Sequence, residues 1–210
     1  MKRLIFALLM FFAIFAVSGC GRGHDSSPTF VSDILSNPAL DGDIEQSPPA
    51  VFTITQGSTQ SVIAGIDPVT GGEFRAFLQF PLASIPGSAI ISSATLDIVI
   101  DSIQPLSGTI PIRIDLVSLQ TTTLFASDYD RINQPALAFR TFPIFQSDLG
   151  RHVVVDVTPL MQEAQRLSLS SFQIRILEDL GIVSPGLVEI NDTNGVNRRN
   201  LAPLLEVIYF

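Results

Sequence analysis

Five carboxylates of this chain could supply oxygen ligands to a calcium ion. Asp41, Asp43 and Glu45 occupy alternate positions of one acidic segment, and Glu189 and Asp192 lie shortly before the last predicted strand. Calcium takes roughly six to eight oxygen ligands, many of them from carboxylates. The spacing is not that of an EF-hand loop. The alternatives to a structural calcium site are a solvated acidic segment at residues 41–45 and an ordinary turn at Glu189 and Asp192. Calcium is the one possible cofactor that the sequence suggests.

Few residues of the chain are suited to catalysis. His24 lies in a Gly/Ser/Asp/Pro-rich segment, and His152 begins a predicted strand without a nucleophile motif nearby. Asp156 and Thr158 precede a predicted helix, where a carboxylate and a hydroxyl satisfy free amide groups. The sequence contains no Gly-x-Ser-x-Gly, His-Glu-x-x-His, phosphate-loop or dinucleotide motif. We expect that the protein is not an enzyme.

The charge balance argues against a nucleic-acid partner. The chain has 12 Lys and Arg against 20 Asp and Glu, a formal net charge of −8. Nucleic-acid affinity comes largely from cations that neutralise phosphates, and the arginines here are dispersed. Three of them, Arg75, Arg113 and Arg175, occupy outward positions of separate predicted strands and could gather locally.

The first 20 residues have the layout of a secretory signal peptide. Lys2 and Arg3 precede an uncharged apolar run over residues 4–17, and Ser-Gly then precedes Cys20, the only cysteine. This ending resembles a bacterial lipobox, in which the cysteine thiol receives a diacylglycerol and becomes the new N-terminus. The resemblance implies lipidation of Cys20 and a protein held at the cell membrane. An uncleaved spanning helix is the alternative, but it needs about 20 apolar residues.

The residue after the cysteine bears on localisation. In lipoproteins of two-membrane bacteria an Asp at this position favours the inner membrane, so Gly21 implies the outer membrane. Loss of Lys2 and Arg3 with the signal peptide changes the formal charge from −8 to −10. Such a chain does not adhere electrostatically to anionic lipid, so attachment must come from the acyl chains.

The hydrophobic pattern divides the chain into three parts. Residues 1–19 form the signal peptide, residues 20–45 the lipidated cysteine with a flexible tether, and residues 46–210 a folded domain. Within the domain, alternation of apolar and polar residues is typical of half-buried strands. It predicts strands over residues 73–80, 94–101, 110–116, 152–157, 172–176 and 205–209.

Pro- and Gly-rich breakers separate these strands, and only one helix is predicted. Thr158 can cap it, Pro159 suits its first position, and it continues to Arg166. This pattern predicts an all-β fold, a two-sheet antiparallel jelly-roll-like sandwich with one short helix. Residues 125–146 form the longest irregular stretch. We interpret it as a flap over a sheet edge with its Phe residues tucked inward; a functional loop is the alternative.

Three segments resemble the motifs of DNRLRE-type domains, which are similar to carbohydrate-binding module family 96. They are Phe77-Leu-Gln-Phe-Pro-Leu-Ala-Ser-Ile-Pro-Gly, Val153-Val-Val-Asp-Val-Thr-Pro-Leu and Ala202-Pro-Leu-Leu-Glu-Val-Ile-Tyr. They follow in the family's order from near Ala50 to the C-terminus. The resemblance implies a jelly-roll sandwich of secreted and surface proteins, some of which bind acidic polysaccharides such as alginate.

The resemblance leads to a functional hypothesis. The family often carries two Trp residues in the region that corresponds to residues 125–135, and this chain contains no Trp and two Tyr, of which Tyr129 lies in that region. Tyr129 is therefore the expected ring for stacking on a sugar, with Arg75, Arg113 and Arg175 as partners of an acidic one. We expect a lipid-anchored, non-catalytic protein of the cell envelope that binds a polysaccharide or surface polymer. The alternative is a structural or protein-interaction component of an envelope assembly with no sugar affinity.

Overall fold

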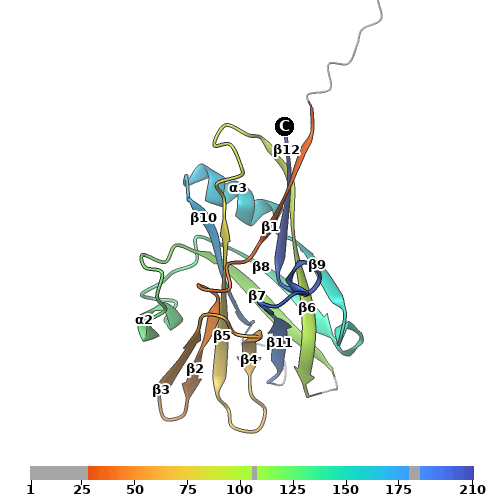
Figure 1. Ribbon diagram of the computed structural model, residues 1–210. Coiled ribbons are helices and arrows are strands. Elements are labelled where there is room, and N and C mark those ends of the chain that lie inside the picture. The colour runs from red at the N-terminus through yellow and green to blue at the C-terminus, as the bar shows by residue number, and fades with distance from the viewer. Residues whose placement is uncertain (1–27, 106–107, 180–184) are drawn as a thin grey trace, which may run out of the picture.

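The computed structural model describes residues 28–105, 108–179 and 185–210, and this part of the chain is an all-β structure (Figure 1). Twelve strands form one antiparallel sheet with the order β1-β12-β6-β11-β4-β5-β10-β7-β8, in which β2 and β3 attach at β5 and β9 attaches at β6. The predicted fold class is confirmed. The strands are β1 (Phe30–Leu35), β2 (Gly42–Ser47), β3 (Val51–Gln56), β4 (Ser61–Ile66), β5 (Glu73–Pro81), β6 (Ile91–Gln104), β7 (Thr109–Val117), β8 (Ala138–Phe145), β9 (His152–Asp156), β10 (Ser171–Glu178), β11 (Leu187–Asn191) and β12 (Leu204–Tyr209).

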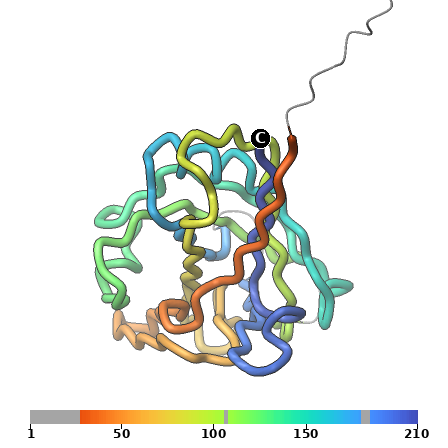
Figure 2. The backbone as a smooth tube through the Cα atoms, turned by 45° about the horizontal axis from the view of Figure 1, so that its top comes forward, coloured from red at the N-terminus to blue at the C-terminus, as the bar shows by residue number. Residues whose placement is uncertain are grey.

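The long strand β6 joins the two halves of this sheet. Its first part pairs with β12 and β9, and its last part, from Ile100 to Gln104, pairs with β11. The other half contains β4, β5, β10, β7 and β8, with β2 and β3 at its side. Figure 2 shows how the sheet curls so that its halves enclose a common interior. The sandwich is thus continuous through β6.

The main hydrophobic core fills this interior with side chains from both halves. Leu96 and Ile98 of β6 are buried in the same cluster as Ile114 of β7 and Phe172 of β10. The rings of Phe80 and Phe172 lie 6.2 Å apart between centroids. Each fully buried side chain of this size contributes about 1.5–3 kcal/mol relative to an exposed one. The alternating apolar residues of the predicted strands therefore supply the energy that closes the sandwich.

The folded unit begins earlier than the predicted boundary at residue 46. Strand β1 pairs with β12 from Phe30 opposite Tyr209 to Leu35 opposite Leu204, and β2 pairs with both β3 and β5. The predicted tether over residues 20–45 is therefore too long. The apolar–polar alternation did not indicate β2, because Ile44 is the only large apolar residue of this strand. Strand β2 is instead stabilised by its pairing with β3 and β5.

One helix of more than a single turn occurs among the described residues, α3 (Thr158–Arg166), as predicted. Thr158 does not cap it, because its hydroxyl instead accepts from the backbone N–H of Ala94 at 2.9 Å and fixes the helix start to β6. The carboxylate of Asp156 accepts from the N–H of Thr158 at 3.0 Å, the structural role expected for it. The remaining helical segments are α2 (Ala126–Tyr129), α4 (Arg198–Leu201) and a 3-10 turn over residues 146–148.

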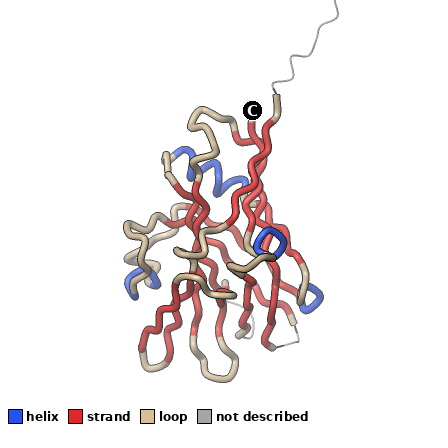
Figure 3. The backbone as a smooth tube through the Cα atoms, viewed as in Figure 1, coloured by secondary structure: helices blue, strands red, loops and turns tan. Residues whose placement is uncertain are grey.

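The predicted flap proves to be two different structures. Residues 138–145 form strand β8, which pairs with β7. Residues 118–137, here called the covering segment, include α2 and lie over an outer face of the sheet (Figure 3). Phe125, Phe139 and Phe145 are exposed, so the prediction that the Phe residues tuck inward is wrong for these three. Leu124 and Tyr129 make the inward contacts instead.

Candidate functional site

The covering segment buries a face of the sheet that the sequence pattern assigns to solvent. Ile44 and Phe77 from the sheet pack against Leu124 and Tyr129 in a second hydrophobic cluster. The side chain of Gln56 fixes the segment, because its Oε1 accepts from the N–H of Leu124 at 2.9 Å. Polar residues of β5, β7 and β10 that share this outer face therefore become buried.

Asp115 gathers arginines beneath the covering segment. Its Oδ1 accepts from Nε of Arg113 at 2.6 Å, and its Oδ2 accepts from Nη2 of Arg175 at 2.8 Å. Nε of Arg131 lies 4.0 Å from the same Oδ2. Nη1 of Arg175 donates to the backbone carbonyl of Asp128 at 3.1 Å. Burial lowers the pKa of Arg175 and the charge of Asp115 opposes this, so the guanidinium keeps its charge at neutral pH.

Arg75 links this cluster to the ring of Tyr129. Its guanidinium carbon lies 3.8 Å from the ring centroid, a cation–π contact. Its Nη1 donates to the backbone carbonyl of Tyr129, and its Nε donates to Glu73 at 2.8 Å. Phe52 meets the same ring edge-on, with 5.3 Å between centroids. Burial raises the pKa of Tyr129, which is therefore a neutral phenol.

A pocket of about 300 Å³ opens beside these rings, at the lower end of the range for small-ligand sites. Its lining contains two guanidinium groups, one amide and two aromatic rings against a single carboxylate. Arg131 is the accessible cation, with 42% of its side chain exposed. The hydroxyl of Tyr129 is buried and has no hydrogen-bond partner in the described residues. The lining residues are Gln46, Phe52, Arg75, Tyr129, Asp130 and Arg131.

The predicted ligand-binding residues meet in space, but not as an open surface. Arg75 and Arg175 are buried, and Arg113 is largely covered because it lies over the ring of Phe139 at 3.8 Å. The prediction that Tyr129 offers an exposed stacking ring is wrong, since only 5% of the residue is exposed. Strand alternation identifies a side chain that points away from the main core, but it does not reveal a distant segment that covers it.

Sequence reasoning missed Gln46, Phe52 and Arg131 as pocket residues. Arg131 lies in the irregular stretch that could have been a functional loop, which was a usable signal. Phe52 and Gln46 lie on β3 and β2 at the margin of the predicted domain. Nothing in their local pattern indicated that they would adjoin a loop some 80 residues further along the chain.

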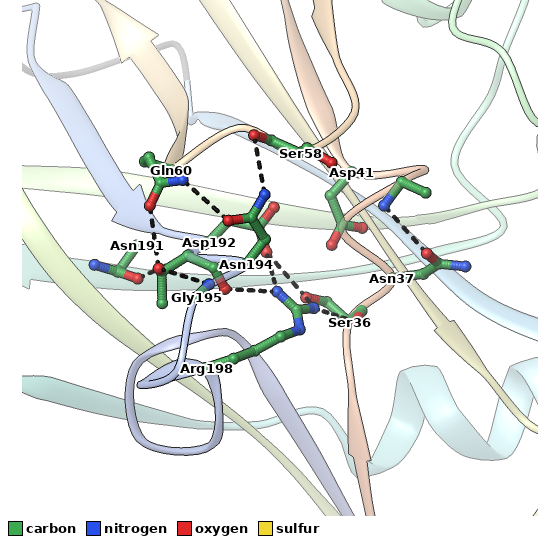
Figure 4. A network of polar contacts seen from close by, with 12 residues as sticks. Ser36, Asn37, Asp41, Ser58, Gln60, Asn191, Asp192, Asn194, Gly195 and Arg198 are labelled. Carbon is green, nitrogen blue, oxygen red and sulfur yellow. Dashed lines mark hydrogen bonds and ion pairs between the residues drawn. The ribbon is translucent and has the colours of Figure 1, made fainter.

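A second polar site lies where Asp41 and Asp192 meet (Figure 4). Oδ1 of Asp41 accepts from the backbone N–H of Gln79 at 2.8 Å. Oδ1 of Asp192 accepts from the hydroxyl of Ser36 at 3.2 Å and from Nη1 of Arg198 at 3.3 Å. Both carboxyl groups are fully buried. The site joins the segment before β2 to the segment after β11, which are about 150 residues apart in the sequence.

Each of these carboxyl groups keeps one oxygen, Oδ2, without a partner among the described residues. Burial and the neighbouring charge of Asp192 raise the pKa of Asp41 to about 8. Burial also raises the pKa of Asp192, and Arg198 opposes this effect. With its pKa near 8, Asp41 is largely protonated at neutral pH, so the pair carries a single negative charge that balances Arg198.

The five predicted calcium ligands do not form one site. Asp41 and Asp192 adjoin, whereas the other three carboxylates have separate partners. In the part of the chain that the structure describes, no group of three or more His, Cys, Asp or Glu residues is placed to hold a metal. Oxygens of Asp43, Glu45 and Glu189 accept hydrogen bonds from the N–H of Ile63 and the hydroxyls of Ser47 and Ser61, respectively.

Cys20 and the signal peptide lie outside the described residues, so lipidation stays a prediction. No helix within the described ranges is long and apolar enough to cross a membrane. The fold defines the chain as an all-β protein with a continuous antiparallel sandwich. Comparison with protein-family models and with curated proteins finds no match to it. The resemblance to DNRLRE-type domains therefore rests on the three quoted segments.

Proposed function

We propose that this protein is a lipid-anchored, non-catalytic binding protein of the cell envelope, and that the pocket beside Arg131 takes an acidic unit of a polysaccharide or surface polymer. The observation that supports binding is the meeting of Arg75 and Arg131 with the ring of Phe52 in one open pocket. The proposed anchor rests on the signal-peptide pattern that ends at Cys20.

The chemistry of the pocket suits a carboxylated sugar. A guanidinium group recognises a carboxylate through paired N–H donors, and among the described residues Arg131 has only a distant ion-pair partner, Asp115 at 4.0 Å. The exposed part of Phe52 offers an apolar surface to a sugar ring, and the amide of Gln46 offers both a donor and an acceptor to its hydroxyls. A pocket of about 300 Å³ admits one such unit of a longer polymer.

The binding part can be tested with the mature chain carrying Cys20→Ser, which blocks lipidation. Titration with uronic-acid oligosaccharides should give saturable binding, and Arg131→Ala should weaken it by about tenfold or more, because a charge-assisted hydrogen bond is worth about 1.5–3 kcal/mol. Arg166→Ala is the matched control, since it removes an exposed arginine from α3. Absence of binding to acidic and neutral oligosaccharides, with and without calcium, would overturn this proposal.

The anchor has its own test. Labelled fatty acid should be incorporated into the wild-type chain, and Cys20→Ala should abolish both this labelling and retention in the membrane fraction. Continued labelling of the Cys20→Ala variant would contradict lipidation at this residue. The sugar-binding and anchoring parts of the proposal are thereby judged separately.

The alternative, a structural component that pairs with another protein, is favoured by strand β3. Among the described residues it pairs only with β2, its residues 51–55 are solvent-exposed and it carries no charge. A free, uncharged edge of this kind can accept a further strand. Association of the mature chain into larger species that Thr53→Lys dissociates, together with absence of sugar binding, would favour this alternative.

A further inference from the structure

The end of the sheet nearest the proposed anchor is apolar. There β1, β12 and the approach to β6 end side by side: Phe30 lies opposite Tyr209, and the backbones of Ile90 and Phe210 exchange hydrogen bonds of 2.9 and 3.2 Å. Between 46% and 60% of Phe30, Val31, Ile90 and Phe210 is exposed. Figure 1 shows the start of β1 and the C-terminus at this end.

An uncharged loop extends the same surface. Residues 82–89 connect β5 to β6 and contain no Asp, Glu, Lys or Arg. The loop is held at this end because the hydroxyls of Ser32 and Ser84 lie 2.9 Å apart and Nε2 of Gln165 donates to the carbonyl of Ala89 at 2.6 Å. We call the four exposed apolar residues and this loop the apolar tip.

Carboxylates begin directly behind the apolar tip. Asp33 lies opposite Glu206 in the β1–β12 pair, and the next strands place Thr95 and Asp156 in the same row. This row is two residues from Val31, or about 7 Å along the strand. An apolar end followed by a row of acidic residues matches the change from lipid to water at a bilayer surface.

The length of chain before β1 keeps the apolar tip near the membrane. Phe30 follows Cys20 by ten residues, which span at most about 36 Å when fully extended. With acyl chains on Cys20, the tip cannot move further from the bilayer than this. The β4–β5 turn lies at the opposite end of the described structure (Figure 1), so the chain before β1 does not hold that turn near the membrane.

We propose that the apolar tip lies against the lipid bilayer, with Phe30, Ile90 and Phe210 in its interfacial layer. This inference rests on the proposed anchoring at Cys20 and adds a second, non-covalent contact. The domain is then held in one orientation, and the β4–β5 turn, with Val69, points away from the membrane. Because the formal charge without Lys2 and Arg3 is −10, the contact depends on apolar side chains and not on attraction to anionic lipid.

The absence of Trp from the sequence makes the contact measurable. Phe210→Trp and Ile90→Trp each place the only Trp of the protein in the apolar tip, and Val69→Trp places it on the β4–β5 turn, where Val69 is 86% exposed. The lipidated mature proteins are reconstituted in vesicles of phosphatidylethanolamine and phosphatidylglycerol, with or without brominated acyl chains. Bromine should lower the emission of both tip probes about twofold or more and leave the Val69→Trp probe unchanged, since interfacial aromatic residues reach the quencher.

The possible results separate the tip contact from the anchor. Flotation of the protein with the vesicles but no quenching of either tip probe would overturn the tip contact and leave anchoring intact. Equal quenching at Val69→Trp would also overturn it, because the domain would then have no single orientation. Shielding of the tip probes by self-association, without quenching, would assign the surface to a second copy. Failure of the lipidated chain to float would instead overturn the anchor.

Discussion

Nη2 of Arg175 donates to Oδ2 of Asp115 at 2.8 Å, and both side chains are completely buried. The pair lies between the sheet and the covering segment, whose carbonyl at Asp128 accepts from the other Nη of Arg175. Asp115 also pairs with Arg113. The carboxylate of Asp115 thus balances the charges of arginines next to the covering segment. The position of the covering segment therefore depends on Asp115.

Asp115→Ala should therefore destabilise the protein strongly. The substitution leaves Arg175 buried without its counter-charge, and breaking a buried pair in this way costs about 3–5 kcal/mol. Urea unfolding should show a clearly lower midpoint. The control is Glu163→Ala, which breaks the exposed pair with Arg166 on α3 and should leave the midpoint unchanged. An unchanged midpoint for Asp115→Ala would contradict the role of this carboxylate.

The Asp41–Asp192 pair predicts that stability falls as the pH rises. The pKa of Asp41 is about 8 in the folded protein and near 3.8 in the unfolded chain, so the folded state holds a proton that the unfolded state releases. Its stabilising contribution is complete below pH 3.8 and is lost as the pH rises through about 8. The raised pKa of Asp43, about 6, acts in the same sense.

Asp41→Asn is the variant that checks this titration. The Asn keeps an acceptor for the N–H of Gln79 but carries no proton that titrates, so the decrease in unfolding free energy between pH 5 and 8 should become shallower. Asp67→Asn is the control: its pKa is lowered by the N–H of Val69, so its removal cannot flatten this decrease. The same pH slope in wild type and Asp41→Asn would contradict the raised pKa of Asp41.

The sequence pattern was informative for strands that pack one of their two faces on the main core. Alternation located β5, β7 and β10 and identified Arg75 and Arg175 as residues that point away from that core. It assigned these residues to solvent, because a period of two describes the faces of a strand and not what packs on each face. The covering segment buries them, and its contacts depend on residues far apart in the chain.

The Asp41–Asp192 pair also shows that a local sequence pattern does not predict contacts between distant residues. Asp41 and Asp192 were identified as chemically interesting, but as part of a five-residue calcium site. Their meeting depends on β1 pairing with β12 and on β11 lying beside β4, and no local pattern encodes such pairings. The family resemblance predicted a sandwich fold, but it did not predict the strand register that brings individual side chains together.

Close backbone contact at Gly65 gives a further prediction. Gly65 has φ +115°, and an added Cβ would lie 2.1 Å from the carbonyl oxygen of Gly186. Both the conformation and the contact exclude a larger residue, so Gly65→Ala should separate β4 from β11 and lower the melting temperature sharply. Gly87→Ala is the control, since its added Cβ meets nothing within 4 Å. Equal melting temperatures for the two variants would contradict this close packing.

Substitutions at Tyr129 distinguish a packing role from direct sugar stacking. The ring fills the cluster with Ile44, Phe77 and Leu124, so Tyr129→Ala should lose about 3–5 kcal/mol of unfolding free energy through the cavity it leaves. Tyr129→Phe keeps the ring beneath Arg75 and removes a buried hydroxyl that lacks a partner in the described residues, so it should be neutral or slightly stabilising. Urea unfolding and oligosaccharide titration of both variants decide the matter. The packing role would be contradicted if Tyr129→Ala kept the stability of the wild type. A difference between the two variants in sugar affinity alone would instead make the ring a sugar-binding surface.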